Sequence, residues 1–176
     1  MSLNQVSQAV QAAVLSRISD PVYGINPGIA VNCSNYSLPN FLTIDFSQSS
    51  VNFSQAQIEP DLLEVSGMVK FPFTCLYTLE SAETNTQKFN QFSGVVRSIL
   101  EINLSWAGIR GMPNFEQYCN CLEDVVLDVY NRTTNQNWPN PLVYNGQIQC
   151  KRGAVSYGGD NWRQKVGFSA IFEVHR

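Results

Sequence analysis

Three acidic residues in the second half of the chain, Glu123, Asp124 and Asp128, have the side chains best suited to acid–base or metal chemistry. Asp124 and Asp128 are four residues apart in a predicted helix, so their carboxylates share one face of it. Together with Glu123 they offer the oxygen ligands that a divalent cation takes, or a pair for general acid–base catalysis. An exposed acidic stripe on a solvated helix explains the same pattern with fewer assumptions. We therefore expect no catalytic residue and no metal site.

The other reactive side chains do not combine into a known site. His175 is the only histidine, lies one residue from the end, and alternates to the face opposite Phe172 and Val174, so we expect it to be solvated. The five cysteines include no C-x-x-C pair, which argues against zinc, and we expect them to be reduced thiols packed as small hydrophobic groups. They are Cys33, Cys75, Cys119, Cys121 and Cys150. There is no nucleophile elbow, phosphate loop or dinucleotide fingerprint, so we predict no cofactor and no enzyme.

Composition limits the class of protein. The chain has 176 residues, 44% of them hydrophobic, which suits one domain over 1–176. A net charge of −3 with only 14% charged residues provides no basic surface for phosphates, so sequence-specific nucleic-acid binding is not expected. The N-terminus has no lysine or arginine before its first apolar residues, and no long apolar run is present. We therefore expect neither a secretory signal nor a membrane span.

Helical periodicity appears in three places. The range 3–18 repeats apolar residues at three and four positions and ends at Asp20-Pro21. The range 84–106 has a similar stripe and is also predicted to be a helix. A third helix is predicted over 115–129, where apolar residues alternate with the acidic run. All three stripes are interpreted as faces that pack on a core.

Two-residue alternation predicts very long strands over 62–79 and 158–176. Fully extended, the second would run about 45 Å, against a radius of gyration of about 16 Å for a compact chain of this size. Asn145-Gly146 predicts a hairpin turn, and Gly158-Gly159 marks another reversal. Helices combined with hairpins indicate an α+β domain in which about three helices pack on a largely antiparallel, mixed sheet.

The range 21–58 has one charged side chain, Asp45, among Asn, Ser, Gln, Gly and Pro. Its aromatic residues, among them Phe41 and Phe53, indicate that this neutral arm or insertion packs against something. A neutral segment loses less solvation when buried, so we expect contact with another subunit, with an ordinary surface loop as the alternative.

The order of these elements resembles the tail-terminator (tail-completion) proteins of long-tailed bacteriophages and their relatives in the neck. The resemblance runs through an N-terminal helix, a polar arm, a strand leading into "TNTQKFNQFSGVVRSIL", an acidic helix, "NGQIQCKRG" and "GGDNWRQKVGFSAIFEVH". It covers roughly 62–176 and the first helix, and rests on shapes and spacings rather than on catalytic motifs. The long neutral range 21–58 departs from the family pattern.

The resemblance implies a structural virion protein at the head–tail junction, assembled in the cytoplasm of the infected bacterium. Such a protein forms a ring, expected to be a homohexamer, that ends tail-tube polymerisation and joins the head-side connector. Its partners would be its own copies, the tube protein, the connector, and a sheath if the tail is contractile, with the genome passing through the lumen and no membrane involved.

Under this reading the long strands project and contact the next subunit, because ring contacts join unlike patches. Candidate interface residues are Arg163, Lys165, Ile171, Glu173, Phe41 and Phe53. Glu123, Asp124 and Asp128 are candidates for an acidic lumen wall that repels DNA phosphates, with plain solvent exposure as the alternative.

Other functions stay open at this point. Another neck or connector protein (a stopper or adaptor) or a tube-like ring protein would show similar elements. A small metal-dependent hydrolase would use the acidic cluster around Asp124, and a carbohydrate-binding module is weakly indicated by Trp138 and Trp162 among Asn and Gln.

Overall fold

The computed structural model describes residues 3–33, 43–47, 53–55, 73–84, 94–107, 112–132, 138, 142–154, 156–158 and 161–174. Within these residues, six strands form one sheet in the order β1-β2-β3-β6-β4, with β5 also paired to β6. The strands are β1 (Phe53–Ser54), β2 (Phe73–Thr84), β3 (Gly94–Ala107), β4 (Leu142–Arg152), β5 (Ser156–Gly158) and β6 (Asn161–Val174). The pairing of β1 with β2 is parallel, and the other pairings are antiparallel.

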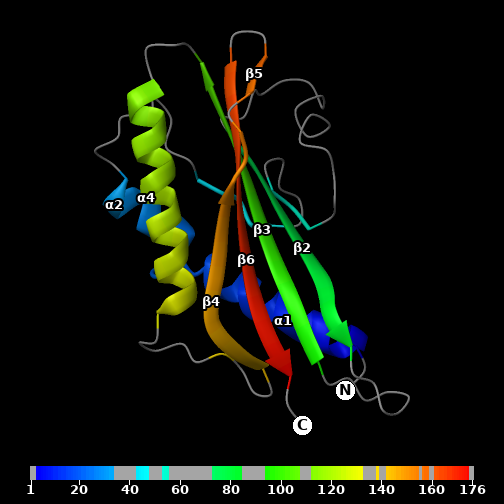
Figure 1. Ribbon diagram of the computed structural model, residues 1–176. Helices are drawn as coiled ribbons and strands as arrows, with labels where there is room; N and C mark the ends of the chain where they lie inside the picture. The colour runs from blue at the N-terminus through cyan, green and yellow to red at the C-terminus, as the bar shows by residue number, and fades with distance from the viewer. Residues whose placement is uncertain are drawn as a thin grey trace.

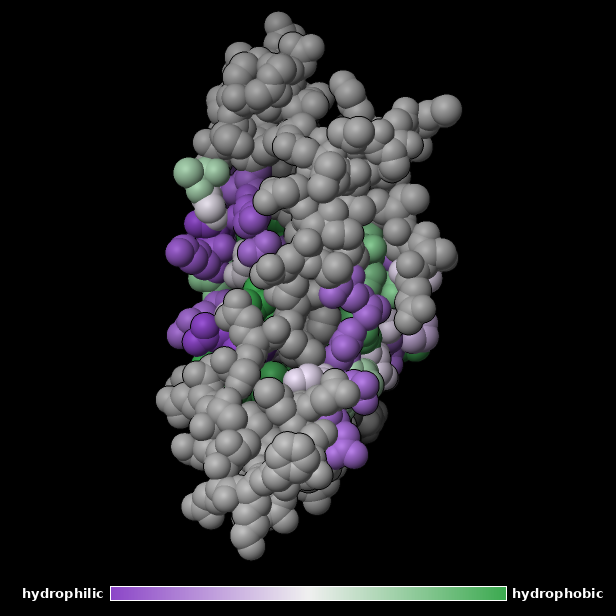
Figure 2. All heavy atoms as spheres, turned by 90° about the vertical axis from the view of Figure 1, so that its right-hand side faces the viewer, coloured by the Kyte–Doolittle hydropathy of each residue, from purple (hydrophilic) through white to green (hydrophobic). Residues whose placement is uncertain are grey.

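The inner face of β3 and β6 forms the floor of the core. Val96, Leu100 and Ile102 of β3 are buried, as are Val166, Phe168, Ala170 and Phe172 of β6. Ser98 of β3 is buried in the same row, and the residues that alternate between these positions are half-buried, as expected for an antiparallel sheet with one covered face. Figure 2 views the molecule from the β2 side and shows two groups of hydrophilic side chains, with smaller hydrophobic patches beside and between them.

The helices α1 (Leu3–Ile18), α2 (Ile25–Asn32) and α4 (Met112–Asn131) supply the other layer. Figure 1 shows α1 behind the strands and α4 beside β4. α1 buries one residue every fourth position, which is one helical stripe: Val6, Val10, Val14 and Ile18. The combination of helices with a mostly antiparallel sheet agrees with the expected α+β class. None of the helices in the described part of the chain is both long and apolar enough to cross a membrane.

The helix predicted over 84–106 is wrong. Gly94–Ala107 is the strand β3, paired with both β2 and β6, while 85–93 lie outside the described residues. Val95, Val96 and Ile99 fit a helical stripe by spacing, but β-branched residues also favour strands. The true alternation was hidden because Ser98, a fully buried polar residue, occupies one of the inner positions.

The hairpin predicted at Asn145-Gly146 is also wrong. β4 continues through these residues and pairs with β6 on both sides of them, with a register shift between Tyr144 and Ile148. Both residues tolerate unusual backbone angles, so the same signal serves a bulge as well as a turn. The reversal predicted near Gly158 is present, because Gly158 pairs with Asn161 between β5 and β6. β2 starts at Phe73, and the earlier part of the strand predicted over 62–79 lies outside the described residues.

The described parts of the neutral range 21–58 pack on their own domain. The helix α2 was not predicted, because Pro27 and Gly28 in "INPGIAVN" argue against a helix. Its Ile25 and Ile29 are buried in the core, as is Ile44. The Asn26 side chain donates to the carbonyl of Ile44 at 2.8 Å and accepts from its N–H at 2.9 Å, which fixes this part of the chain beside α2.

Candidate functional site

A groove of about 600 Å³ lies where α2 meets α4. Its walls are mostly polar: Asn32, Gln117, Asn120, Cys121, Asp124, Val125, Asp128 and Arg132. Seven of these eight residues come from α4 or the residue that follows it, and Asn32 comes from the end of α2. The groove therefore depends on how α2 is held against α4.

Three contacts hold α2 antiparallel to α4. Before α2 begins, the guanidinium of Arg132 lies 5.2 Å from the ring centre of Tyr23 and donates to its carbonyl at 3.5 Å. In the middle of α2, a Cβ added at Gly28 would lie 2.6 Å from Cγ1 of Val125, so the helices approach too closely for any side chain. The third contact, at the end of α2, is covalent.

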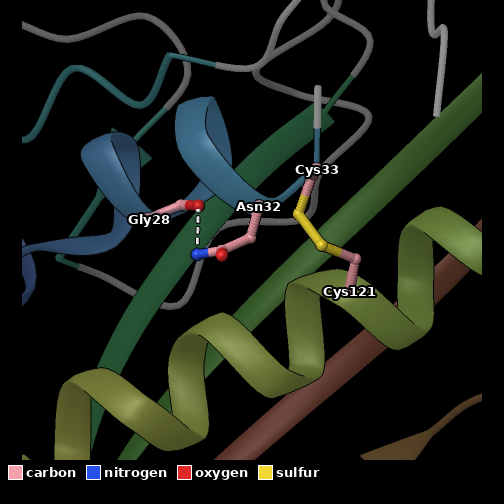
Figure 3. Close-up of a disulfide and its surroundings, with 4 residues drawn as sticks. All are labelled: Gly28, Asn32, Cys33 and Cys121. Atoms are coloured by element: carbon pink, nitrogen blue, oxygen red, sulfur yellow. Dashed lines mark hydrogen bonds between the residues drawn. A yellow bond between two sulfur atoms is a disulfide. The ribbon is translucent and has the colours of Figure 1, made fainter. Parts of the chain in front are cut away.

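Cys33 and Cys121 form a disulfide with a Cα–Cα distance of 5.9 Å and a separation of 88 residues. Figure 3 shows it joining the end of α2 to α4, with the Asn32 amide donating back to the carbonyl of Gly28 at 3.0 Å. The expectation that every cysteine is a reduced thiol is therefore wrong for this pair. Spacing could not reveal the pair, because the contact requires a helix that the sequence did not predict and its antiparallel packing on α4.

The structure separates the three acidic residues. Asp124 and Asp128 are exposed and line the groove, and Asp128 forms an ion pair with Arg132. Glu123 points toward β4 instead, where it forms an ion pair with Arg152. Their hydrogen bond raises the pKa of the Arg152 guanidinium. Among the residues that the structure describes, no group of three His, Cys, Asp or Glu side chains is placed to hold a metal ion.

Among the cysteines whose side chains the structure describes, Cys119 and Cys150 are free, and the side chain of Cys75 lies outside the described part. Burial raises the pKa of Cys119 to about 11, and its thiol donates to Oε1 of Gln164 at 3.5 Å. Cys150 is exposed, but partial desolvation of its thiol, followed by the nearby Glu123, raises its pKa to about 12. Both thiols are therefore protonated at neutral pH, which leaves them poor nucleophiles.

A buried arginine joins α1 to the end of α4, and no pattern in the sequence predicted it. Arg17 is 6% exposed; its Nε donates to the carbonyl of Val129 at 2.6 Å, and its Nη2 donates to that of Arg132. These are carbonyls at the C-terminus of α4, where a cation also interacts favourably with the helix dipole. Desolvation by burial lowers the pKa of Arg17.

Trp138 belongs to the same cluster. The Arg17 guanidinium lies 4.5 Å from its ring centre, and the ring packs edge-on against Phe172 at 4.8 Å. Trp138 also contacts Tyr130 and Tyr144. This packing removes the weak indication that Trp138 is an exposed sugar-stacking residue. Trp162 is placed only by its backbone pairing with Trp106.

The predicted interface residues of β6 lie on its outer face. Arg163, Lys165, Ile171 and Glu173 alternate with the buried row of Val166 and Phe172, and Arg163 is placed by register alone. Lys165 is exposed and forms an ion pair with Glu101 of β3 at 3.3 Å, while Ile171 and Glu173 are half-buried. The structure therefore gathers these four positions on one surface of the sheet.

The two aromatic interface candidates behave differently. Phe53 is only 3% exposed and packs edge-on against Phe46, with ring centres 5.2 Å apart. The prediction that Phe53 contacts a neighbouring subunit is therefore wrong, because its own core already covers it. Phe41 and His175 lie outside the described residues.

The expectation that the C-terminal strand projects to pair with another copy is wrong for its backbone. β6 pairs with β3 along its whole length, from Gly94 opposite Val174 to Ala107 opposite Asn161. Its other edge pairs with β4 and, near the start, with β5. Only the side chains of its outer face can take part in a contact with a neighbour.

A scan against models of known protein families finds no match for this chain, and a search of curated proteins finds no relative. The geometry consists of a polar groove, protonated thiols and a row of outward-facing side chains.

Proposed function

We propose that the chain is a structural subunit of a ring at the head-proximal end of a phage tail tube, where it ends tube growth and joins the head-side connector. The order of elements described above, with its resemblance to tail-terminator proteins, supports this proposal. The observation that carries it is the outer face of the two central strands, where apolar and charged side chains alternate without deep burial. In this proposal the long strands β3 and β6 form a stiff wall of the ring.

The composition of this outer face suits a contact between copies. Ile99 and Ile171 are half-buried aliphatic residues on neighbouring strands, with Arg97 paired opposite Ile171. Glu101 and Lys165 lie further along the same face. Interfaces commonly place apolar groups at the centre and charged groups around them. Subunits of a closed ring meet through unlike patches, so this face would pack against a different surface of the next copy.

The exposed carboxylates of α4 suit the lumen of such a ring. Asp124 and Asp128 face solvent, and Glu116 is exposed on the same helix. A wall of negative charge repels phosphates and lets a genome pass without adhering. Glu123 does not take this role because it is half-buried and paired with Arg152 of β4, whereas Asp128 stays exposed beside its own partner, Arg132.

Growth stops at such a ring because its two ends differ. One end matches the last ring of tube protein, whereas the other matches the connector, so no further tube protein can add. The partners would be copies of the chain, the tube protein, the connector and, in a contractile tail, the sheath. The site of action is the head–tail junction of the virion.

Electron microscopy of the purified chain mixed with tail tubes tests the position of the ring. The proposal expects extra density at one tube end only, and tails of irregular length that fail to join heads when the gene is deleted. Normal tails and infectious particles after deletion would refute it. Density on isolated connectors but not on tubes would instead favour another neck position, such as a stopper or adaptor.

A charge placed at Ile171 tests the proposed contact surface. We expect Ile171→Glu to prevent ring formation on tubes while the circular dichroism spectrum stays native, because the side chain lies on the outer face. Val31→Glu is the matched control, since Val31 is a β-branched residue that is 75% exposed on α2. Rings that form equally well from both variants would show that the outer face of β6 is not the contact.

A further inference from the structure

We propose that the Cys33–Cys121 disulfide is a redox latch on the α2–α4 groove, open in the reducing cytoplasm where the chain is made and closed in the released particle. The timing of this inference rests on the proposed function, because disulfides persist outside cells and are rare in most cytoplasms. The latch itself rests on the geometry of α2.

The latch closes one end of the groove. Cys121 lines the groove directly, and Asn32, the residue before Cys33, forms part of the opposite wall. The disulfide therefore fixes the distance between these two walls (Figure 3). Without it, the end of α2 has no covalent link to α4, and the wall carrying Asn32 can move away from the wall carrying Asp124.

The rest of α2 stays anchored when the disulfide is reduced. Ile25 and Ile29 are buried in the core, and the middle of α2 packs on Val125 through Gly28. The start of α2 is held through Tyr23 and Arg132. Reduction should therefore release the last turn of α2 while the domain stays folded, which distinguishes a latch from a disulfide required for folding.

Among the cysteines whose side chains the structure describes, no free thiol is placed to reach the disulfide. Cys119 lies two positions from Cys121, on the other side of α4, where its thiol contacts Gln164 of β6. Cys150 lies beside Glu123, which faces β4. Neither of these two thiols faces α2, so among the described side chains none is placed for exchange and the reaction uses an external thiol. Cys121, which lines the groove, is 9% exposed.

The reaction is ordinary thiol–disulfide exchange. A thiolate of an external dithiol attacks Sγ of Cys121, the bond to Cys33 breaks, and the Cys33 sulfur takes a proton. The second thiol of the reagent then closes on the mixed disulfide and releases Cys121 as a thiol. The protein gains two electrons and two protons, and the dithiol is oxidised to a cyclic disulfide. Closure is the reverse, with a small-molecule disulfide as the oxidant.

The purified chain tests the latch without any tail component. After treatment with dithiothreitol in the absence of denaturant, we expect alkylation of Cys33 and Cys121 together, with a native circular dichroism spectrum. Hydrogen exchange in 30–33 should rise at least about tenfold more than exchange in α1 and β6, where any rise reports only the lower global stability of the chain without its cross-link. The double variant Cys33→Ser/Cys121→Ser should show the same pattern without a reductant.

Three results would overturn the latch. They are a disulfide that is reduced only in denaturant, a rise in hydrogen exchange that is uniform across the whole domain, and an exchange rate in 30–33 that does not change. Alkylation of the chain inside bacterial cells tests the timing separately, since we expect both cysteines as thiols there. If the purified chain shows the local opening on reduction but forms no ring on tail tubes, the proposed function is refuted and the latch stands. If the chain forms the ring but shows no local opening, the latch is refuted and the proposed function stands.

Discussion

Removal of the Cys33–Cys121 disulfide should cost this protein a large part of its stability. The cross-link closes a loop of 88 residues, for which the chain-entropy relation gives about 4.6 kcal/mol at 25 °C. With an unfolding entropy of about 2.1 cal/mol/K per residue over 176 residues, this corresponds to a fall in melting temperature of about 12 °C. The loss should appear in Cys33→Ser/Cys121→Ser and in the wild-type chain under a reductant.

Calorimetry and urea titration measure this loss directly. Cys150→Ser is the matched control, because Cys150 is an exposed free cysteine and its replacement should change the melting temperature little. Wild-type protein in a reductant should have the same melting temperature as the double variant. Cys150→Ser should have the same melting temperature as the oxidised wild type. A loss below about 1 kcal/mol would refute the reasoning, because the loop would then impose almost no constraint on the unfolded chain.

Further substitutions probe the contacts around α4. Gly28→Ala should destabilise by about 1 to 3 kcal/mol because its Cβ meets Val125, whereas Gly153→Ala, whose Cβ would be 3.5 Å from its nearest neighbour, should be close to neutral. Adding Val125→Ala to Gly28→Ala should give a smaller loss than the two single losses summed; simple additivity in urea titrations would rule out this contact. Arg17→Met should lower the free energy of unfolding by about 2 to 4 kcal/mol, because the carbonyls of Val129 and Arg132 lose their hydrogen-bond donor. It should also shift tryptophan emission, since the guanidinium packs on Trp138. An unchanged melting temperature would contradict the capping role. Cys119 keeps its proton up to about pH 11 in the folded state, against an ordinary pKa of 9.0, so its contribution to the free energy of unfolding should be intact below pH 9 and lost as pH rises through 11. Cys119→Ala should flatten this decline, and an identical pH slope in variant and wild type would count against it.

Local pattern identified the elements whose signals agree with one another. The stripe of α1 every fourth residue predicts a helix and its buried face, and the structure has both. The acidic helix followed from the same reasoning and is present as α4, from Met112 to Asn131. The alternation near the C-terminus predicted which residues of β6 face the core. These predictions succeeded because helix and strand periods place side chains on faces without reference to the rest of the chain.

Predictions from local pattern were wrong where the same sequence pattern is compatible with two different structures. The range 94–107 fits a helical stripe by spacing, yet pairing with two neighbouring strands makes it β3, with Ser98 buried at an inner position. Asn145-Gly146 is compatible with a turn and with a bulge, and the pairing of β4 with β6 decides for the bulge. In each case contacts made far along the chain outweigh a weak local preference.

By itself, the sequence determined the mixed helix–sheet class of this protein, the core faces of α1, α4 and β6, and the position of the carboxylates on one acidic helix. Tertiary structure decided which of these residues meet. It turned Glu123 toward Arg152 and left Asp124 in the groove. It also brought Cys33 against Cys121 across 88 residues. The physical reason is that periodicity fixes the direction of a side chain from its own element, whereas its partner depends on long-range packing, which one element does not encode.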